Sequence, residues 1–171
     1  MIKSAHSYKE KLEKQIYESW YNLQNQYWNY GCSDGVVKLS EDNWSNHQFV
    51  SIGKDDNVEG YITYAIDHQS LKSYGWGIIS FTKGSLIFAK DLYQIIYDVF
   101  FKYNLNKIEF CAYTDNPAID AYRKFLKKVG GNSIGVRHQS NMLLDHKLHD
   151  TEEFEIMKGN FKPIKNWRFK A

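Results

Sequence analysis

The stretch FCAYTDNPAIDAYRKFLKKVGG, residues 110–131, contains a predicted strand, a sharp junction and a predicted helix. Pro117 fits the first turn of a helix, where its missing N–H would be unpaired in any case. Asn116 or Asp115 can cap that helix, and the glycine pair 130–131 suits its end. A helix over 117–129 then carries an apolar inner face, composed of Ala118, Tyr122, Phe125, Leu126 and Val129.

Hydrophobic periodicity on both sides of this junction predicts the remaining elements. The expected order is helix, three strands, helix, strand, helix and two strands, without internal repeats. This order predicts an α/β (α+β) domain with one mostly antiparallel central sheet flanked by helices. The expected ranges are helix 8–30, strands 48–53, 58–66 and 74–81, helix 87–103, strand 107–114, helix 117–129, and strands 133–144 and 152–158.

Two apolar patterns give specific burial predictions. The first is a helical stripe expected to be core, made of Leu12, Ile16, Trp20, Leu23, Tyr27 and Tyr30. The second is an alternating strand face, made of Val58, Gly60, Ile62, Tyr64 and Ile66. In the next-to-last strand, Ile134 and Val136 are expected to be buried, and His138 shares their parity.

The bulk composition limits the classes of function. The chain of 171 residues suits one domain, predicted over 1–158, followed by a basic tail over 159–171. A net charge of +2 argues against nucleic-acid binding, and no apolar run approaches the roughly 18 residues that span a membrane. Cys32 and Cys111 form no metal or redox motif, which favours a cytoplasmic location. His138, His146 and His149 lack the spacing of a metal site.

The junction and its surroundings resemble the GNAT superfamily of N-acetyltransferases. Asn116, Ala118 and Tyr122 match the Asn, Ala and Tyr that follow a strand in that family, and DDNVEGYITYAI, residues 55–66, resembles its second hairpin. The resemblance extends over roughly 45–158 and rests mainly on the order of elements. The acyl-CoA pyrophosphate loop departs from the family pattern, because only Ala89 matches among Gly84, Ile87 and Ala89.

The resemblance implies an acyl-CoA-dependent N-acetyltransferase that moves an acetyl group from acetyl-CoA to an amine by direct transfer in a ternary complex. Pyrophosphate would bind at the start of the long helix, where backbone N–H groups are unpaired. Main chain at Ile79, Ser80 and Phe81 would polarise the thioester carbonyl. Asn116 would bind the pantetheine arm, or would be a plain helix cap. The residues implied at the pyrophosphate are Lys83, Gly84, Ser85, Ala89 and Lys90.

Tyr122 is the implied general acid of this reaction. A leaving thiolate has a conjugate-acid pKa near ~8.5 and a tyrosine one near ~10, so proton donation is uphill by roughly 2 kcal/mol. A positioned acid can supply that. The alternative role for Tyr122 is a core tyrosine whose hydroxyl has a backbone partner.

Other features leave alternatives open. The general base is Glu59, Asp67, His68, Tyr113 or Asp115, or an ordered water chain. The acceptor is a small-molecule or peptide amine, no metal is expected, and a homodimer is left open. The alternative function is a catalytically inactive GNAT-like module that binds a protein or nucleic acid through its basic, aromatic tail.

Overall fold

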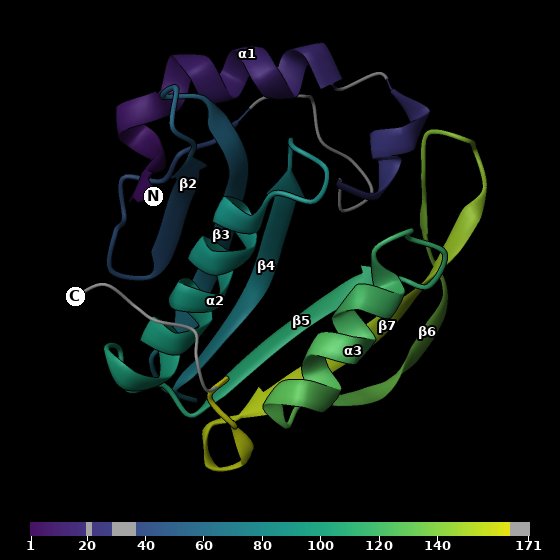
Figure 1. Ribbon diagram of the computed structural model, residues 1–171. Helices are drawn as coiled ribbons and strands as arrows, with labels where there is room; N and C mark the ends of the chain where they lie inside the picture. Colours follow the sequence, from purple (N-terminus) through teal and green to yellow (C-terminus); the bar gives the residue numbers. More distant parts are fainter. Residues whose placement is uncertain (20–21, 29–36, 165–171) are drawn as a thin grey trace.

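The computed structural model describes residues 1–19, 22–28 and 37–164. These residues form one seven-stranded sheet with the order β1-β2-β3-β4-β5-β7-β6 (Figure 1). Every neighbouring pair is antiparallel except β4 and β5. The elements are β1 (Ile2–Ser4), η1 (Ala5–Tyr8), α1 (Lys9–Ser19), η2 (Leu23–Trp28), β2 (Asn46–Ile52), β3 (Val58–Asp67), β4 (Lys72–Ser80), α2 (Leu86–Phe101), β5 (Lys107–Tyr113), α3 (Ile119–Val129), β6 (Asn132–Met142), β7 (Leu148–Met157) and η3 (Lys158–Asn160).

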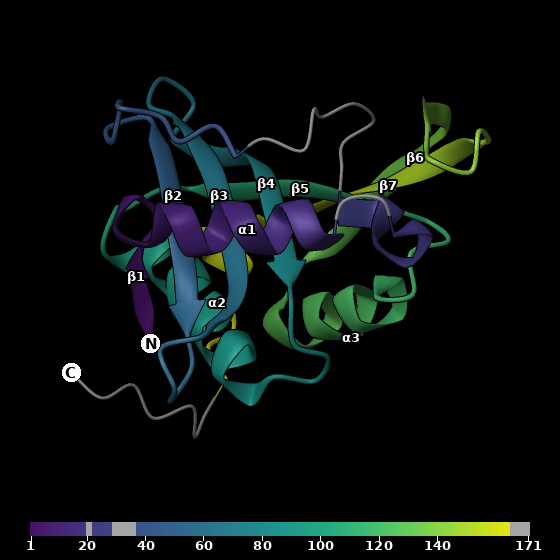
Figure 2. The same cartoon turned by 90° about the horizontal axis from the view of Figure 1, so that it is seen from above.

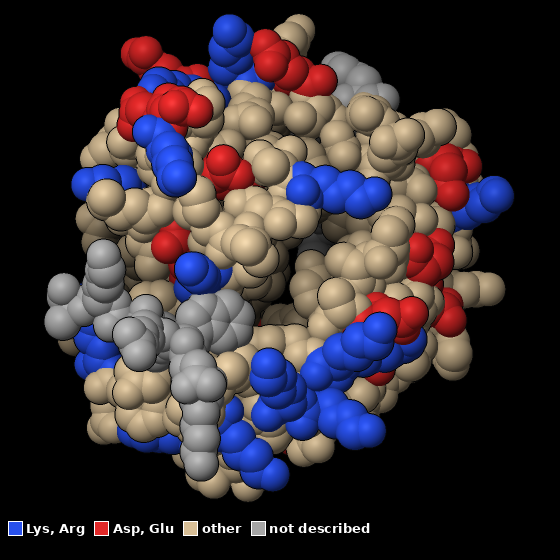
Figure 3. Space-filling view, viewed as in Figure 1, with Lys and Arg blue, Asp and Glu red and all other residues tan. Residues whose placement is uncertain are grey.

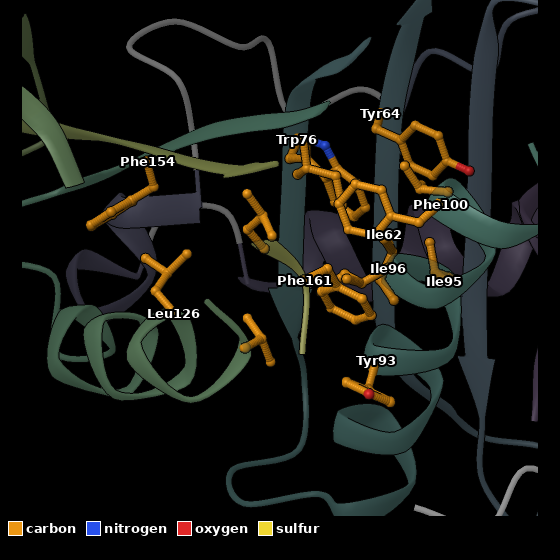
Figure 4. Close-up of a cluster of buried hydrophobic side chains, with 14 of the residues drawn as sticks. Ile62, Tyr64, Trp76, Tyr93, Ile95, Ile96, Phe100, Leu126, Phe154 and Phe161 are labelled. Atoms are coloured by element: carbon orange, nitrogen blue, oxygen red, sulfur yellow. The ribbon is translucent and has the colours of Figure 1, made fainter. Parts of the chain in front are cut away.

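Helices cover both faces of the sheet (Figure 2). Helices α2 and α3 share one large core with the strands, in which Val99, Phe100 and Phe154 are almost wholly buried (Figure 4). A smaller core on the other face packs Leu12 and Ile16 of α1 against β2 and β3. The mixed α/β class and the mostly antiparallel sheet predicted from the sequence are therefore confirmed. None of the described helices is long and apolar enough to cross a membrane.

The predicted first helix is wrong in its length. Helix α1 ends at Ser19, and a separate 3-10 helix, η2, begins at Leu23. The Ser19 carbonyl accepts hydrogen bonds from the Asn22 amide at 3.3 Å and the Asn25 side chain at 3.2 Å. The Asn25 side chain therefore competes with the backbone hydrogen bonds of a continued α-helix. Leu23 is exposed instead of buried, and the predicted core residues Trp20 and Tyr30 lie outside the described residues.

Two burial predictions for strands also need correction. A register shift between Ser51 and Ile52 moves Val58 onto the α1 face, while Ile62 and Tyr64 face α2. Ile134 and Val136 are exposed, at 55% and 44%, because β6 is an edge strand with little covering it. The short N-terminal strand β1 had no signal in the sequence pattern.

Strand β4 differs sharply along its two edges. Against β3 it is paired from Lys72 to Ser80, with a bulge in β4 near Gly75. Gly75 has φ +62, a left-handed conformation that side chains with a Cβ rarely adopt. Against β5 it is paired only at Lys72 and Ser73, opposite Lys107 and Ile108. Beyond the bulge the two parallel strands separate, and a gap opens in the sheet.

Candidate functional site

A cavity of about 790 Å³ occupies the gap between β4 and β5. Its wall includes Phe88 and Leu92 of α2 from one face of the sheet, and Tyr27 and Trp28 of η2 from the other. The cavity therefore extends through the sheet, and the surface is hollowed between α2 and α3 (Figure 3). We call the part beside α2 and α3 the helix half, and the part beside η2 the η2 half.

Tyr122 lines the helix half of the cavity from the first turn of α3. Its ring packs edge-on against Phe110, with centroids 6.1 Å apart. Its hydroxyl accepts or donates no hydrogen bond within the described part of the chain. Burial raises the pKa of this hydroxyl above its usual value of 10.0, so it stays protonated through neutral pH. A protonated hydroxyl that lies beside a cavity and is unbonded in the described ranges can donate a proton to a bound group.

Asn116 lines the same half and also organises the start of α3. Its side-chain oxygen accepts a hydrogen bond from the Ala118 amide at 2.9 Å, and its carbonyl accepts one from Ile119 at 2.9 Å. The sequence suggested Asn116 as the cap of the helix, but α3 begins at Ile119 with Ala118 as its N-cap and no side-chain cap bond, so Asn116 orders the turn that precedes the helix. The oxygen is occupied by this bond, but the amide nitrogen has no acceptor among the described residues. The side chain can hold this turn and donate to a ligand at the same time.

The start of α2 is exposed next to the gap. Ser85 caps the helix, because its hydroxyl accepts from the Phe88 amide at 3.0 Å. The next amide, of Ala89, is bonded to the Ser85 carbonyl. The amides of Leu86 and Ile87 have no acceptor in the described chain, and Leu86 is 77% exposed. Two unpaired amides and a positive dipole end thus face solvent.

The loop before α2 adds charge and an open turn to this helix start. Gly84 has φ +73, and a Cβ there would meet nothing within 4 Å. Lys83 and Lys90 are exposed and form no ion pair with a described residue. None of the predicted loop residues, Lys83, Gly84, Ser85, Ala89 and Lys90, lines the cavity itself. They form its outer surroundings, where an extended ligand that leaves the cavity could pass.

The backbone N–H and C=O groups of residues 79–81 do not all point toward the gap. The Phe81 amide donates to the Glu59 carbonyl of β3 at 2.9 Å. The Ile79 carbonyl also lies on the β3 side, 2.6 Å from where a Cβ on Gly60 would be. Because alternate residues of a strand point to opposite edges, the backbone groups of Ser80 and Ile78 point toward the gap. Ser80 and Ile78 also line the cavity, whereas Ile79 and Phe81 pack on the α1 side.

The η2 half of the cavity is aromatic and acidic, and most of it was not anticipated. Tyr27 and Trp28 enter from η2, and Tyr113 and Glu109 from β5. Tyr27, expected in the core, is a cavity residue because α1 ends early. Of the five candidate bases, Tyr113 is the one that lines the cavity, while Glu153 was missed. The sequence signal for Glu153 is its alternation with Phe154, which marks a polar strand face without revealing a cavity.

A histidine network closes the end of the η2 half. His149 is 7% exposed, and its ring nitrogens bond Asp115 at 2.6 Å and Asp145 at 2.9 Å. Its ring also packs edge-on against Tyr27 and Tyr113. Burial pulls the pKa of His149 down, but the hydrogen bonds to the two carboxylates outweigh burial and raise it. This network ties the β5–α3 junction to the β6–β7 turn.

The structure brings three sequence-predicted residues together at the cavity, namely Ser80, Asn116 and Tyr122. Four of the five base candidates lie away from its wall: Glu59, Asp67, His68 and Asp115. Cys111 lines the η2 half, and Cys32 lies outside the described residues. Most of the basic tail also lies outside them, but Phe161 is buried against the α2 core (Figure 4).

Comparison with known proteins identifies the fold. No protein-family profile and no curated protein matches the chain. Among solved structures, the spermidine N-acetyltransferase of Vibrio cholerae in complex with CoA and spermine matches with a TM-score of 0.71 at 14% identity, over 94% of this chain and 96% of that one. A chimera of the Vibrio cholerae enzyme SpeG and hSSAT matches with a TM-score of 0.66 at 17% identity, over 93% and 96%. The chain therefore has the GNAT fold expected from the sequence.

Proposed function

We propose that this protein is an acyl-CoA-dependent N-acetyltransferase. One observation carries the proposal: β4 and β5 separate, and a cavity passes through the sheet between them. Such a gap offers unpaired backbone groups to an extended, amide-containing arm on one face and space for an acceptor on the other. A structural neighbour with the same fold was solved with CoA, which supports CoA as the donor's carrier here.

The donor, acetyl-CoA, would bind from the helix half. Its pyrophosphate would meet the unpaired amides of Leu86 and Ile87 and the charges of Lys83 and Lys90. Its pantetheine arm would enter the gap beside β4, where the Asn116 amide nitrogen can donate to an arm carbonyl. Because the grip on phosphate uses backbone groups, it does not depend on the side chains that depart from the family loop.

Transfer would be direct. The acceptor nitrogen attacks the thioester carbonyl carbon, and backbone N–H groups of Ile78 and Ser80 stabilise the developing oxyanion. The carbon–sulfur bond then breaks, the sulfur takes the Tyr122 hydroxyl proton, and the nitrogen loses a proton to water. Tyr122 recovers its proton from solvent. The two substrates approach from opposite faces of the sheet, so a ternary complex needs no covalent enzyme intermediate.

Thermal unfolding with acetyl-CoA tests the proposal. A ligand at 100 times its dissociation constant stabilises the fold by about 2.7 kcal/mol, which for a chain of this size raises Tm by roughly 5–10 °C. Turnover is then followed as CoA release with a panel of primary amines. No shift at millimolar acetyl-CoA contradicts the proposal. A shift without transfer to any amine favours the inactive binding module instead.

A further inference from the structure

Two carboxylates line the η2 half of the cavity, and they are in different states. Glu109 is already neutralised, because Lys72 donates to one of its oxygens at 2.8 Å and Lys107 lies 2.6 Å from the other. These ion pairs hold the pKa of Glu109 below its usual value, first through Lys107 and then Lys72. Glu109 therefore has little capacity left for a ligand.

Glu153, unlike Glu109, has an oxygen that no hydrogen bond satisfies within the described ranges. Arg137 Nη2 lies 2.9 Å from Glu153 Oε1, yet the contact is not directed as a hydrogen bond, and this buried oxygen has no hydrogen-bond partner among the described residues. No described residue donates to the other oxygen. Arg137 is itself mostly exposed, at 67%, so it can move away at little cost. A carboxylate whose buried oxygen lacks a donor is destabilising unless a ligand supplies one.

Aromatic rings surround the space that Glu153 faces. Tyr27 and Trp28 line it from η2, Tyr74 from β4 and Tyr113 from β5. The π faces of such rings attract cations, most strongly in sites that exclude water. Among the residues that the structure describes, the charged side chains of the wall are two carboxylates and one arginine, and that arginine is the exposed partner of Glu153. This half of the cavity therefore suits a cation better than an anion.

Strand spacing places the cation relative to the reacting nitrogen. Glu153 lies opposite Cys111, on the strand beyond β5 as counted from the gap. Adjacent strands are about 4.8 Å apart, so Glu153 is roughly 7–10 Å from the gap between β4 and β5. A group bound there is too far away to be the nitrogen that attacks the thioester.

We infer, resting on the proposed function, that the acceptor is an aliphatic amine with a second positive charge, which Glu153 binds after displacing Arg137. The reacting nitrogen lies at the gap, and the second ammonium donates to the Glu153 carboxylate. The aromatic side chains around this ammonium are Tyr27, Trp28, Tyr74 and Tyr113. The sequence alone could not reveal this, since Glu153 reads as a solvated strand position.

The test compares 1,5-diaminopentane with pentylamine, which has the same carbon chain and a single charge. We expect the wild-type enzyme to show a kcat/KM for the diamine about 10-fold or more above that for pentylamine, because a charge-assisted hydrogen bond has that effect. Glu153→Gln removes the preference by raising the diamine KM, with pentylamine and acetyl-CoA unaffected. Glu155→Gln is the matched control, since Glu155 lies on the same face of β7 outside the cavity.

A second variant and a binding measurement make the result unambiguous. Arg137→Ala lowers the diamine KM, since it removes the competitor for Glu153. Titration calorimetry with 1,5-diaminopentane gives an equilibrium readout: binding to the wild type that Glu153→Gln weakens about 10-fold supports the inference. Such binding without turnover overturns the proposed function alone. The inference is overturned if the wild type and Glu153→Gln show the same ratio of diamine to pentylamine kcat/KM, or if the wild type does not bind the diamine. Acetylation of pentylamine would still uphold the proposed function in either case.

Discussion

The two edges of β4 contrast within one strand. Toward β3, β4 is paired along its length, from Lys72 opposite Asp67 to Ser80 opposite Gly60. Toward β5, pairing stops after Ser73 opposite Ile108. Strand β5 shows the same asymmetry, because on its other edge it is paired with β7 from Lys107 to Tyr113.

This contrast shows how one sheet can be both scaffold and binding site. Backbone groups in a buried sheet need partners, so an open gap inside a sheet is costly unless a ligand or water occupies it. The paired edges on either side keep the gap walls in place. The rigid part of the molecule therefore lies immediately beside the part that exchanges ligands.

The largest expected effect concerns the edge of β4 that faces the gap, and it is a loss of turnover. Tyr122→Phe removes the hydroxyl that faces the cavity, and we expect kcat to fall about 10²–10⁴-fold, as for loss of a general acid. The acetyl-CoA dissociation constant should change little, because only the proton donor is lost. Steady-state CoA release and calorimetry measure the two quantities.

Tyr103→Phe is the control for this change, because Tyr103 packs against the same core outside the cavity wall. Its kcat should match the wild type. Unchanged kcat in Tyr122→Phe would assign the tyrosine a packing role only.

The paired edge is tested by stability. Ile62 on β3 is fully buried, and its partner Ile78 on β4 is half-buried beside the cavity. Ile62→Ala should lower the free energy of unfolding by about 2–5 kcal/mol through lost burial and a new void. Ile78→Ala should lower it by about 1–2 kcal/mol, since its site already borders open space.

Urea denaturation of both variants measures this difference. Equal losses would show that the gap side of β4 is packed as tightly as the β3 side, and the contrast between the edges would not hold.

Filling the open edge tests cofactor access. Ala118 lines the helix half, so Ala118→Trp should abolish the acetyl-CoA stabilisation of about 2.7 kcal/mol at 100 times the wild-type dissociation constant. Ala121→Trp is the matched control on the same helix, at an exposed position outside the cavity. Thermal shift with and without acetyl-CoA reports both. A full shift in Ala118→Trp places the donor elsewhere.

The smallest effect concerns the His149 network at the end of the paired β5–β7 edge. Its pKa is raised in the folded state, so its stabilisation is fully present below the unfolded value near ~6.5 and is lost as pH rises through the folded value. His149→Gln should therefore reduce stability more at pH 5.5 than at pH 9, by roughly 1 kcal/mol.

Titration of the carboxylate partner Asp145 does not contribute to the stability difference between pH 5.5 and pH 9. His149 lowers the pKa of Asp145 below its usual 3.8, so that carboxylate keeps its contribution until pH falls through the lowered value. Urea unfolding at the two pH values gives the difference. A loss that is equal at both would show that the imidazole acts by packing alone.

Local patterns predicted most of the fold. The junction at 115–117 depends on proline and on the hydrogen bond from the Ala118 amide to the Asn116 side chain, and such local chemistry can be predicted from the sequence. The order of the strands within the sheet was not predicted from the sequence. The break after Ser19 was missed because the apolar stripe continued past it, whereas the Ser19 carbonyl is bonded by the Asn22 backbone amide and the Asn25 side chain.

The candidate site was harder to predict from the sequence, because it depends on how β4 and β5 are paired with their neighbouring strands. The glycines in YGWG, residues 74–77, were a signal for the bulge in β4, but only pairing shows where the strands separate. Tyr122 and Asn116 were found because they follow the junction. Glu153 was not, because its alternation with Phe154 is the same whether the polar face meets solvent or a cavity.

Strand β6 has a consequence for the behaviour of the protein at high concentration. It is the outer strand of the sheet, with exposed Ile134 and Val136 and an edge open to solvent. Such an edge invites sheet extension from molecule to molecule. Its register shifts, between Ser133 and Gly135 and again after Arg137, break the edge into short pieces. Foreign strands can therefore align with only a few residues at a time, which discourages fibrous growth.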